Sequence, residues 1–212
     1  MTFRNRIEAG RRLAVSLQDY SGKPDILLLA LPRGGVPVAA EVAKTLDLPM
    51  DLMLVRKLGL PGHRELAMGA IALGDVRVLN DSVIASSGVS EETLDQVTSE
   101  EKAELDRRNT LYRGENGPPA IKDKTIILID DGVATGATMK AAIAATKQAG
   151  AKETVAAIPV APAETCDELQ RIADRVVCLA TPYPFFGVGQ WYDDFSQTSD
   201  GEVQDLMKPF LN

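Results

Sequence analysis

Short apolar runs alternate with segments of helical periodicity along most of the chain. Runs of four to six apolar residues recur, and between them apolar residues repeat every three or four positions. Strands that are apolar on both faces and separated by helices indicate a parallel sheet covered on both sides. We therefore expect the α/β class, with a doubly wound parallel sheet of about five strands. The predicted strands are 26–31, 51–55, 125–130, 154–159 and 175–180, and the helices between them are 36–47, 137–149 and 163–172.

A long excursion between residues 55 and 125 interrupts this alternation. Its composition predicts a flexible Gly-rich loop over 56–66 and a β-hairpin over 67–79 that turns at Gly74-Asp75. A charged helix is expected from about Ser90 to Tyr112, because Ser90 is a favourable N-cap residue followed by two acids. On this helix Arg107 and Arg108 are interpreted as a solvated pair, an interface position stays open, and the sequence assigns them no role.

The two ends of the chain have different patterns. The N-terminal segment predicts an amphipathic helix with Ile7, Leu13, Ala14 and Leu17 facing inward. Residues 181–197 hold six of the ten Phe, Tyr and Trp residues, which predicts a separate flap or hood. We expect one domain over 1–212, with a core at about 20–180, an inserted hairpin and helix at 67–113 and an aromatic hood at 181–212.

Charge and composition narrow the range of partners. The formal net charge of −7 argues against a nucleic-acid binder, whose affinity would come mainly from clustered Lys and Arg. The apolar runs are far shorter than the roughly 20 residues of a membrane-spanning helix, so no membrane partner is expected. Cys166 and Cys178 lack metal-ligand spacing and are interpreted as reduced thiols, which favours a cytoplasmic protein. An anionic ligand would have to be held by local positive charge.

The stretch TIILIDDGVATGAT at 125–138 carries the clearest chemistry. A buried strand ends in Asp130 and Asp131, and a turn of small residues then leads into a helix. Backbone N–H groups of Ala134, Thr135, Gly136, Ala137 and Thr138 can hold a phosphate at the helix N-terminus. The two carboxylates are acceptors for the hydroxyl groups of a cis-diol. A ribose joined to a phosphate would supply both the hydroxyl groups for the carboxylates and the anion for the N–H groups.

Two other motifs fit this stretch less well. A Walker A loop would need GKS or GKT, and a phospho-acceptor aspartate would not require this turn.

The motif IILIDDGVATGATM resembles the phosphoribosyl-pyrophosphate (PRPP) motif of type I phosphoribosyltransferases. The resemblance implies that Asp130 and Asp131 bind the ribose hydroxyls and that Ala134 to Thr138 bind the 5-phosphate. Gly132 and Ala137 depart slightly from a common form of the motif. The segments PRGG, RK-LG, ELA-GAI and VGQWY-DFSQT extend the resemblance over nearly the whole chain, to an uncharacterised bacterial phosphoribosyltransferase-like group.

Two further loops follow predicted strands. LALPRGGVPVA at 29–39 resembles the pyrophosphate loop of the family, which assigns pyrophosphate binding to Arg33, Gly34 and Gly35. The loop at 56–66 concentrates basic residues, and the resemblance implies a mobile loop that closes over the reaction. Arg56 and Lys57 are its preferred catalytic candidates. Arg64 adds charge, and for His63 either proton transfer or no role remains open.

The aromatic hood is similar in position to the hood of purine-type family members. Phe185, Phe186 and Trp191 are the candidates for stacking on a base, and Asp193 is a candidate for contact with metal-bound water. An alternative is that these aromatic residues form a hydrophobic cluster that holds the C-terminal segment.

The resemblance implies displacement at C1 of PRPP by a nitrogenous acceptor, with release of pyrophosphate. Mg2+ is expected on the pyrophosphate and ribose oxygens, so that Asp130 and Asp131 would contact the metal only through PRPP. Asp131 is the better candidate for a general base. A purine is favoured by the hood, but a pyrimidine, another base or a non-base acceptor stay open. Family members commonly dimerise, which leaves a homodimer open. The alternatives are a PRPP-binding sensor without transferase activity and an interaction domain that has kept only the fold.

Overall fold

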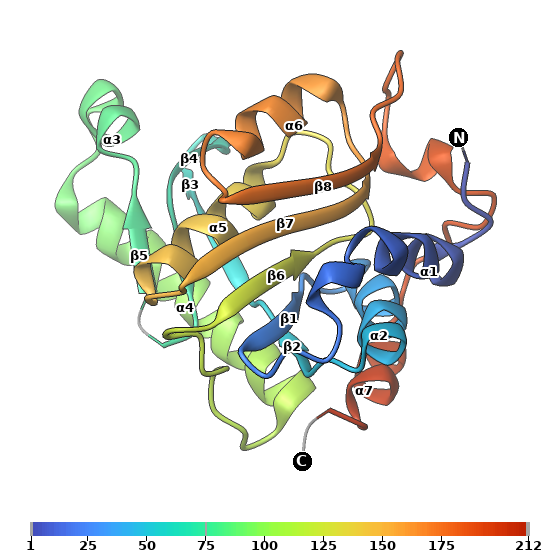
Figure 1. The fold of residues 1–212 in the computed structure, drawn as a ribbon. Coiled ribbons are helices and arrows are strands. Elements are labelled where there is room, and N and C mark those ends of the chain that lie inside the picture. Colours follow the sequence, from blue (N-terminus) through green and yellow to red (C-terminus); the bar gives the residue numbers. More distant parts are fainter. Residues whose placement is uncertain (1, 75, 211–212) are drawn as a thin grey trace.

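A parallel five-stranded sheet forms the centre of the molecule (Figure 1). The computed structural model describes residues 2–74 and 76–210, with only the backbone of Arg64 and Glu65. The order across the sheet is β2-β1-β6-β7-β8, and all neighbouring strands are parallel. The expected fold class is thus confirmed. The strands are β1 (Ile26–Ala30), β2 (Met50–Leu52), β6 (Thr125–Ile129), β7 (Glu153–Val160) and β8 (Arg175–Ala180).

Helices cover both faces of this sheet. Because successive side chains of a strand point to opposite faces, Leu28 and Ala30 pack in one core cluster and Leu27 and Leu29 in the other. The first cluster includes side chains of α1 (Arg6–Ser16), α2 (Gly35–Leu46) and α7 (Asp200–Met207), and the second includes α5 (Ala137–Gln148) and α6 (Ala163–Gln170). The observed helices α2, α5 and α6 begin and end within two residues of the predicted ranges.

The excursion between β2 and β6 builds a second, antiparallel sheet of order β3-β4-β5. Its elements are β3 (Val55–Leu60), β4 (His63–Ala72), β5 (Val76–Leu79), α3 (Asp81–Ser87) and α4 (Glu91–Arg113). The prediction of a loop over 56–66 is wrong, because most of β3 and the start of β4 lie in this range and the two strands pair as a hairpin. The expected hairpin at 67–79 exists as β4 and β5, although Asp75 of its predicted turn lies outside the described residues. The predicted strand 51–55 is divided between the two sheets, and α3 was not predicted.

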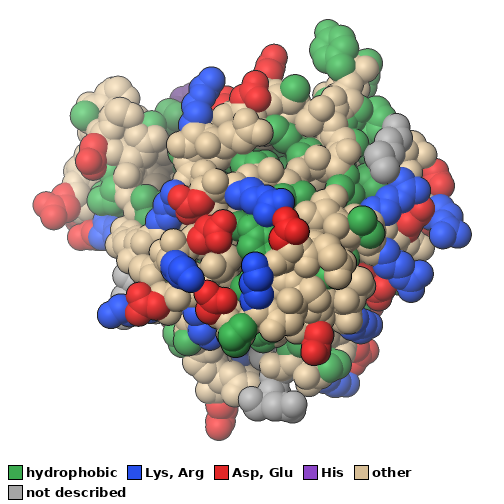
Figure 2. All heavy atoms as spheres, in the orientation of Figure 1, with side chains coloured by type: hydrophobic (Ala, Val, Ile, Leu, Met, Phe, Trp, Pro, Cys, Tyr) green, Lys and Arg blue, Asp and Glu red, His purple; other side chains and the backbone are tan. Residues whose placement is uncertain are grey.

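The chain after β8 rises from the main body at the upper right of Figure 1 and then returns along α1 and α2. It contains the short helix η2 (Val188–Trp191), and η1 (Gln18–Tyr20) follows α1. Tyr183 is 97% exposed and Phe186 is 81% exposed. Green apolar side chains are visible on this projecting segment in Figure 2. The residues that follow are tied to the N-terminus, because Phe3 donates its backbone N–H to the Trp191 carbonyl at 2.8 Å.

The N-terminal helix packs closely on α2. A Cβ at Gly10 would lie 2.6 Å from the Val38 carbonyl oxygen, so only glycine permits this approach. Leu13, Ala14 and Leu17 are buried as expected, but Ile7 is 44% exposed. The prediction for Ile7 was wrong because the inward face of the first turns is occupied by Ala9 and Gly10.

The register of the central strands brings the functional loops together. Ala30 of β1 pairs with Ile129 of β6, so both strands end at the same level. The segment that begins at Leu31 and the pair Asp130-Asp131 therefore leave the sheet side by side. This is the edge at which open α/β sheets bind ligands. None of the described helices is long and apolar enough to cross a membrane.

Candidate active site at the carboxyl edge of the sheet

A hollow of about 150 Å³ lies at this edge, between β6, α5 and β3. Asp130 borders it, and the small residues of the turn form its floor. Lys57 of β3 borders it too, so a cation and a carboxylate line the same hollow. The structure thus brings together Asp130, Lys57 and the whole turn Ala134 to Thr138, as the sequence predicted.

The turn is shaped to present backbone N–H groups to the hollow. Gly136 has a φ of +76°, a conformation that favours glycine, and it is the N-cap of α5. The Thr165 hydroxyl donates to the Ala134 carbonyl at 2.6 Å, and Lys140 Nζ donates to the Thr135 carbonyl at 3.2 Å. These bonds hold two carbonyl oxygens of the turn. The first N–H groups of α5 have no partner within the helix and attract an anion.

The two aspartates occupy different environments. Asp130 keeps part of its surface exposed and accepts the Asp131 backbone N–H at 2.9 Å. Asp131 is 8% exposed, and its Oδ2 atom lies 2.7 Å from Arg6 Nε. Burial raises the pKa of Asp130 well above its usual range, and the neighbouring Asp131 adds to this. Burial also raises the pKa of Asp131, but Arg6 opposes that rise.

The sequence favours Asp131 as the general base, and two features of the structure bear on that prediction. Its carboxylate is engaged by Arg6 and does not line the hollow with Asp130. Arg6 also donates through Nη1 to the Ser196 carbonyl at 2.6 Å and lies 4.0 Å over the Phe195 ring. Arg6 was not among the residues predicted from sequence, because nothing local links it to an aspartate 125 positions away.

The glycines of the first loop pack against the acidic pair. A Cβ on Gly34 would lie 2.0 Å from Asp131 Oδ2, and one on Gly35 would lie 2.5 Å from the Ile129 carbonyl oxygen. The peptide bond between Pro32 and Arg33 is cis. The Arg33 guanidinium lies 3.5 Å from Asp200 of α7 rather than in the hollow. The loop therefore lies beside the acids, as the observed register of β1 and β6 requires.

Other predicted site residues lie farther out. Arg56 pairs with Glu101 of α4 at 2.6 Å and borders a second small hollow with Pro32 and Thr138. His63 is exposed at the start of β4 and is not among the residues that line the hollow beside Asp130. The side chain of Arg64 lies outside the described part of the chain.

The hood touches the site through residues that were not predicted from sequence. Val188 packs on Gly132, where an added Cβ would lie 2.4 Å from Val188 Cγ1. The departure from the common motif at Gly132 therefore makes room for the hood. The Tyr192 hydroxyl donates to the Asp131 carbonyl oxygen.

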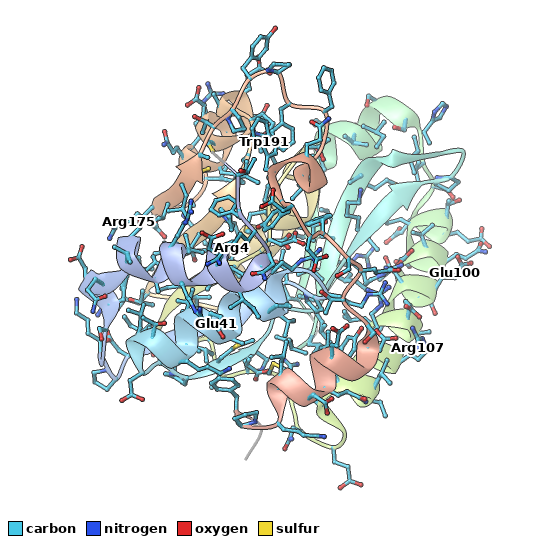
Figure 3. The ribbon with its side chains drawn as sticks, turned by 90° about the vertical axis from the view of Figure 1, so that its right-hand side faces the viewer. Arg4, Glu41, Glu100, Arg107, Arg175 and Trp191 are labelled. Atoms are coloured by element: carbon cyan, nitrogen blue, oxygen red, sulfur yellow. The ribbon has the colours of Figure 1, made fainter. Side chains whose placement is uncertain are left out.

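The three stacking candidates are placed differently. The rings of Phe185 and Trp191 are stacked with centroids 6.4 Å apart, whereas Phe186 is exposed. The buried indole N–H of Trp191, labelled in Figure 3, has no acceptor in the described part of the chain. Phe185 and Trp191 thus belong to an aromatic cluster, whereas a stacking role for Phe186 stays a prediction.

A metal would find few protein ligands here. Among residues 2–74 and 76–210, no group of three or more His, Cys, Asp or Glu side chains could hold an ion. Asp193 is exposed and belongs to no such group. A Mg2+ ion would fit this donor set only if oxygens other than those of the described side chains supplied most of its ligands.

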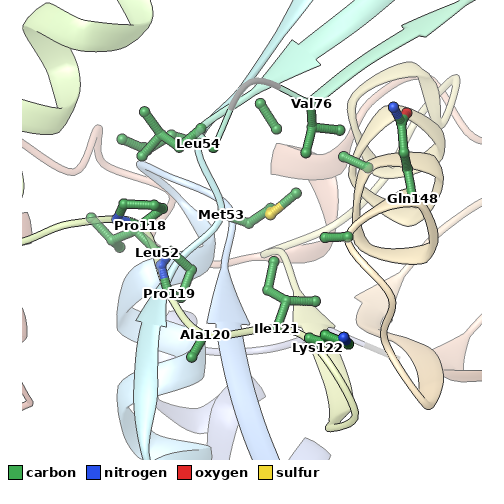
Figure 4. A pocket seen from close by; sticks show the side chains of 15 residues that line it. Leu52, Met53, Leu54, Val76, Pro118, Pro119, Ala120, Ile121, Lys122 and Gln148 are labelled. Atoms are coloured by element: carbon green, nitrogen blue, oxygen red, sulfur yellow. The ribbon is translucent and has the colours of Figure 1, made fainter.

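A larger hollow, of about 460 Å³, lies away from the acidic pair (Figure 4). It is bounded by the turn after β4, by the segment 118–122 and by the C-terminal end of α5. Its labelled side chains are mainly apolar, such as Met53, Leu54, Val76 and Ile121. Such a lining suits neither a phosphate nor a ribose, so the smaller hollow beside Asp130 is the candidate site.

The parallel sheet covered by helices, with an acidic pair and a turn of small residues at its carboxyl edge, places the chain in the α/β class. Residues 3–193 match the family described as "Phosphoribosyl transferase domain". The chain belongs to this family.

Two relatives are informative. A Mycobacterium tuberculosis H37Rv protein named "Putative phosphoribosyl transferase Rv0571c" is 46% identical over 201 residues, which are 95% of this chain and 45% of that protein. The chain therefore spans less than half the length of this relative. The crystal structure of TT1426 from Thermus thermophilus superposes with a TM-score of 0.91 at 37% identity, and the match covers 100% of both chains.

Proposed function

We propose that the protein transfers the 5-phosphoribosyl group of PRPP to a nitrogenous acceptor and releases pyrophosphate. The observation that carries this proposal is the hollow that Asp130, Lys57 and the turn Ala134 to Thr138 line together. A carboxylate, a cation and a set of backbone N–H groups within about 150 Å³ match a ribose 5-phosphate with an anionic substituent at C1.

Each part of the site has a role in this reaction. The turn binds the 5-phosphate, and Asp130 accepts hydrogen bonds from the ribose hydroxyls. Lys57 and Arg33 neutralise the departing pyrophosphate, which stabilises the charge that develops in the transition state. Asp131, held by Arg6, positions Asp130 and the Gly34 turn and does not itself accept a proton. Mg2+ bound to the pyrophosphate oxygens would supply further charge neutralisation.

The acceptor enters from the side of the hood. Phe186 offers an exposed aromatic face, and the hood segment is anchored next to the acids through Val188 and Tyr192. Base-aromatic stacking is itself tolerant of base identity. We favour a purine among the nitrogenous acceptors because the hood is similar in position to the hood of purine-type family members. We place the reaction in the cytoplasm, where PRPP and Mg2+ are available.

The second candidate function is a PRPP sensor without transferase activity. The observation that favours it is the position of Arg33, which is paired with Asp200 rather than directed into the hollow. One experiment separates the two functions. The purified protein is titrated with PRPP and Mg2+, and pyrophosphate release is then followed with a panel of purines and pyrimidines. Release with one base supports the transferase, binding without release supports the sensor, and absence of PRPP binding contradicts both.

A further inference from the structure

One face of α4 points toward the candidate site. Glu101, Leu105, Arg108 and Tyr112 are separated by four, three and four positions, so they lie along one side of the helix. Leu105 and Tyr112 are buried, and Glu101 pairs with Arg56 of β3. Arg108 is held between these inward residues and is only partly exposed.

Arg108 borders the small hollow that also includes Pro32, Arg56 and Thr138. Thr138 lines this hollow and the one beside Asp130 as well, so the two are adjacent. Pro32 directly precedes Arg33 in the loop whose glycines pack on the acidic pair. Arg108 therefore lies at the junction between the phosphate turn and the Pro32-Arg33 turn.

The charges around Arg108 favour an anionic ligand. Glu104 accepts from Arg107 Nε at 2.7 Å and from Arg108 Nε at 2.8 Å. Hydrogen bonds from Arg107 and Arg108 lower the pKa of Glu104 to about 2, so it is ionised at neutral pH. One carboxylate is shared by two guanidinium groups, which leaves positive charge in this cluster. The bond to Glu104 uses one of the three nitrogen atoms of the Arg108 guanidinium, its Nε.

The position of α4 is fixed on both sides of Arg108. Arg113, at the C-terminal end of the helix, pairs with Asp51 of β2 at 2.8 Å. The Tyr112 hydroxyl donates to Asp200 at 2.6 Å, and Asp200 is also the partner of Arg33. Tyr112 and Arg33 thus share Asp200 as a partner, which links the Pro32-Arg33 turn to the helix that carries Arg108.

We propose that Arg108 is a pyrophosphate-binding residue, supplied by the inserted helix α4 opposite Arg33. Its guanidinium would donate to two oxygens of the diphosphate, a geometry that an ammonium group cannot reproduce. This inference rests on the proposed function for its substrate, but its chemistry can be tested with pyrophosphate alone.

Arg107 provides a matched control. It neighbours Arg108 in sequence and shares Glu104, but its side chain is 61% exposed, against 34% for Arg108, and it borders neither of the two hollows at the site. Figure 3 shows Arg107 at the edge of the molecule near the start of α7. Arg107 donates two hydrogen bonds to Glu104 and Arg108 donates one, so a purely structural effect at Glu104 would be at least as large in Arg107→Ala as in Arg108→Ala.

The test is calorimetric titration of inorganic pyrophosphate with Mg2+ into the full chain and its Arg108→Ala, Arg107→Ala and Arg108→Lys variants. Arg108→Ala should weaken pyrophosphate binding at least about tenfold and Arg108→Lys by a smaller factor, whereas Arg107→Ala should stay within about twofold of wild type. Ribose 5-phosphate should bind equally to all four proteins. Equal pyrophosphate affinities of Arg108→Ala and Arg107→Ala, an equal loss for ribose 5-phosphate, or no pyrophosphate binding by wild type would each overturn the inference.

The proposed function is judged separately with PRPP and wild type. Pyrophosphate binding that depends on Arg108, combined with no PRPP binding, would retain this inference and reject the transferase. PRPP binding that is unchanged in Arg108→Ala would retain the transferase and reject the role of Arg108.

Discussion

The Arg6 guanidinium and the Asp131 carboxylate form a nearly buried ion pair, with Nε 2.7 Å from Oδ2 and 11% of each side chain exposed. The pair joins the first turn of the N-terminal helix to the end of the central strand β6. Arg6 also contacts the chain after the hood through Phe195 and Ser196. Three segments that are distant in sequence are thus fixed around one aspartate of the candidate site.

Removal of Arg6 should destabilise the protein. Arg6→Ala would leave Asp131 desolvated and without its cation, and loss of one partner of a buried pair costs about 3 kcal/mol. For a chain of this size that corresponds to a decrease of roughly 6–12 °C in the unfolding midpoint. The control is Arg4→Ala, because Arg4 is 78% exposed and lies 3.5 Å from Glu8. Similar midpoints for the two variants, measured by thermal circular dichroism, would show that the pair does not stabilise the fold.

Substitution of Asp130 should have the opposite effect on stability. Since burial raises the pKa of Asp130 in the folded state, its ionisation opposes folding at any pH above the pKa of the unfolded chain, about 4. Wild type therefore loses stability relative to Asp130→Asn as the pH rises from about 4 through the folded pKa. Asparagine retains the oxygen that accepts the Asp131 N–H.

Thermal unfolding of wild type and Asp130→Asn at several pH values measures this difference. The variant should have the higher midpoint at pH 7.5, by about 1.4 kcal/mol for each unit of pKa shift, and the difference should shrink toward pH 4. A midpoint at pH 7.5 below that of wild type would contradict the assigned environment of Asp130.

The close approach of Gly35 to β6 makes a third prediction. Its Cβ in Gly35→Ala would lie 2.5 Å from the Ile129 carbonyl oxygen and 2.9 Å from the Asp130 Cα. The backbone must shift, which we expect to cost about 1–3 kcal/mol and to weaken PRPP binding about tenfold by displacing Asp130. Gly117→Ala is the control, because a Cβ there meets nothing within 4 Å. If Gly35→Ala has the same unfolding midpoint and the same PRPP affinity as Gly117→Ala, the packing argument is wrong.

The aromatic residues of the hood should fall into two groups, one that binds the acceptor and one that stabilises the fold. Phe186→Ala should leave the unfolding midpoint unchanged and raise the acceptor KM about fivefold or more, because stacking contributes about 1–3 kcal/mol per base. The KM for PRPP should not change. Phe185→Ala should lower the midpoint, since Phe185 stacks on Trp191. Steady-state kinetics with the acceptor varied test this, and an unchanged acceptor KM in Phe186→Ala would remove Phe186 from the base site.

The central sheet could be predicted from sequence because its signal is local. Strands buried on both faces are continuous apolar runs, and the observed β6 covers all but one residue of the predicted range 125–130. The phosphate turn was recognisable for the same reason, since its small residues and the preceding aspartates are adjacent in the chain. Residues 56–66, which hold most of β3 and the start of β4, were misread as a loop, because glycine and proline near the junction of the two strands outweighed a weak β pattern.

The long-range contacts of the site could not be predicted. The partners Arg6 and Asp131 are 125 positions apart, and the partners Arg33 and Asp200 are also far apart in sequence. The inward direction of Arg108 depends on how α4 is anchored by Arg113 and Tyr112, whereas the sequence alone shows only two adjacent arginines on a charged helix. Such contacts are determined by tertiary packing and produce no periodic pattern in the sequence.

The central claim is that PRPP binds in the hollow that Asp130 and the turn Ala134 to Thr138 share. Calorimetric titration of PRPP with Mg2+ into wild type and Asp130→Asn tests it most directly. We expect micromolar binding by wild type and a loss of at least about tenfold in the variant, which should remain folded with an unfolding midpoint no lower than that of wild type. Equal PRPP affinities in the two proteins, or no binding by wild type, would contradict the assignment of this site.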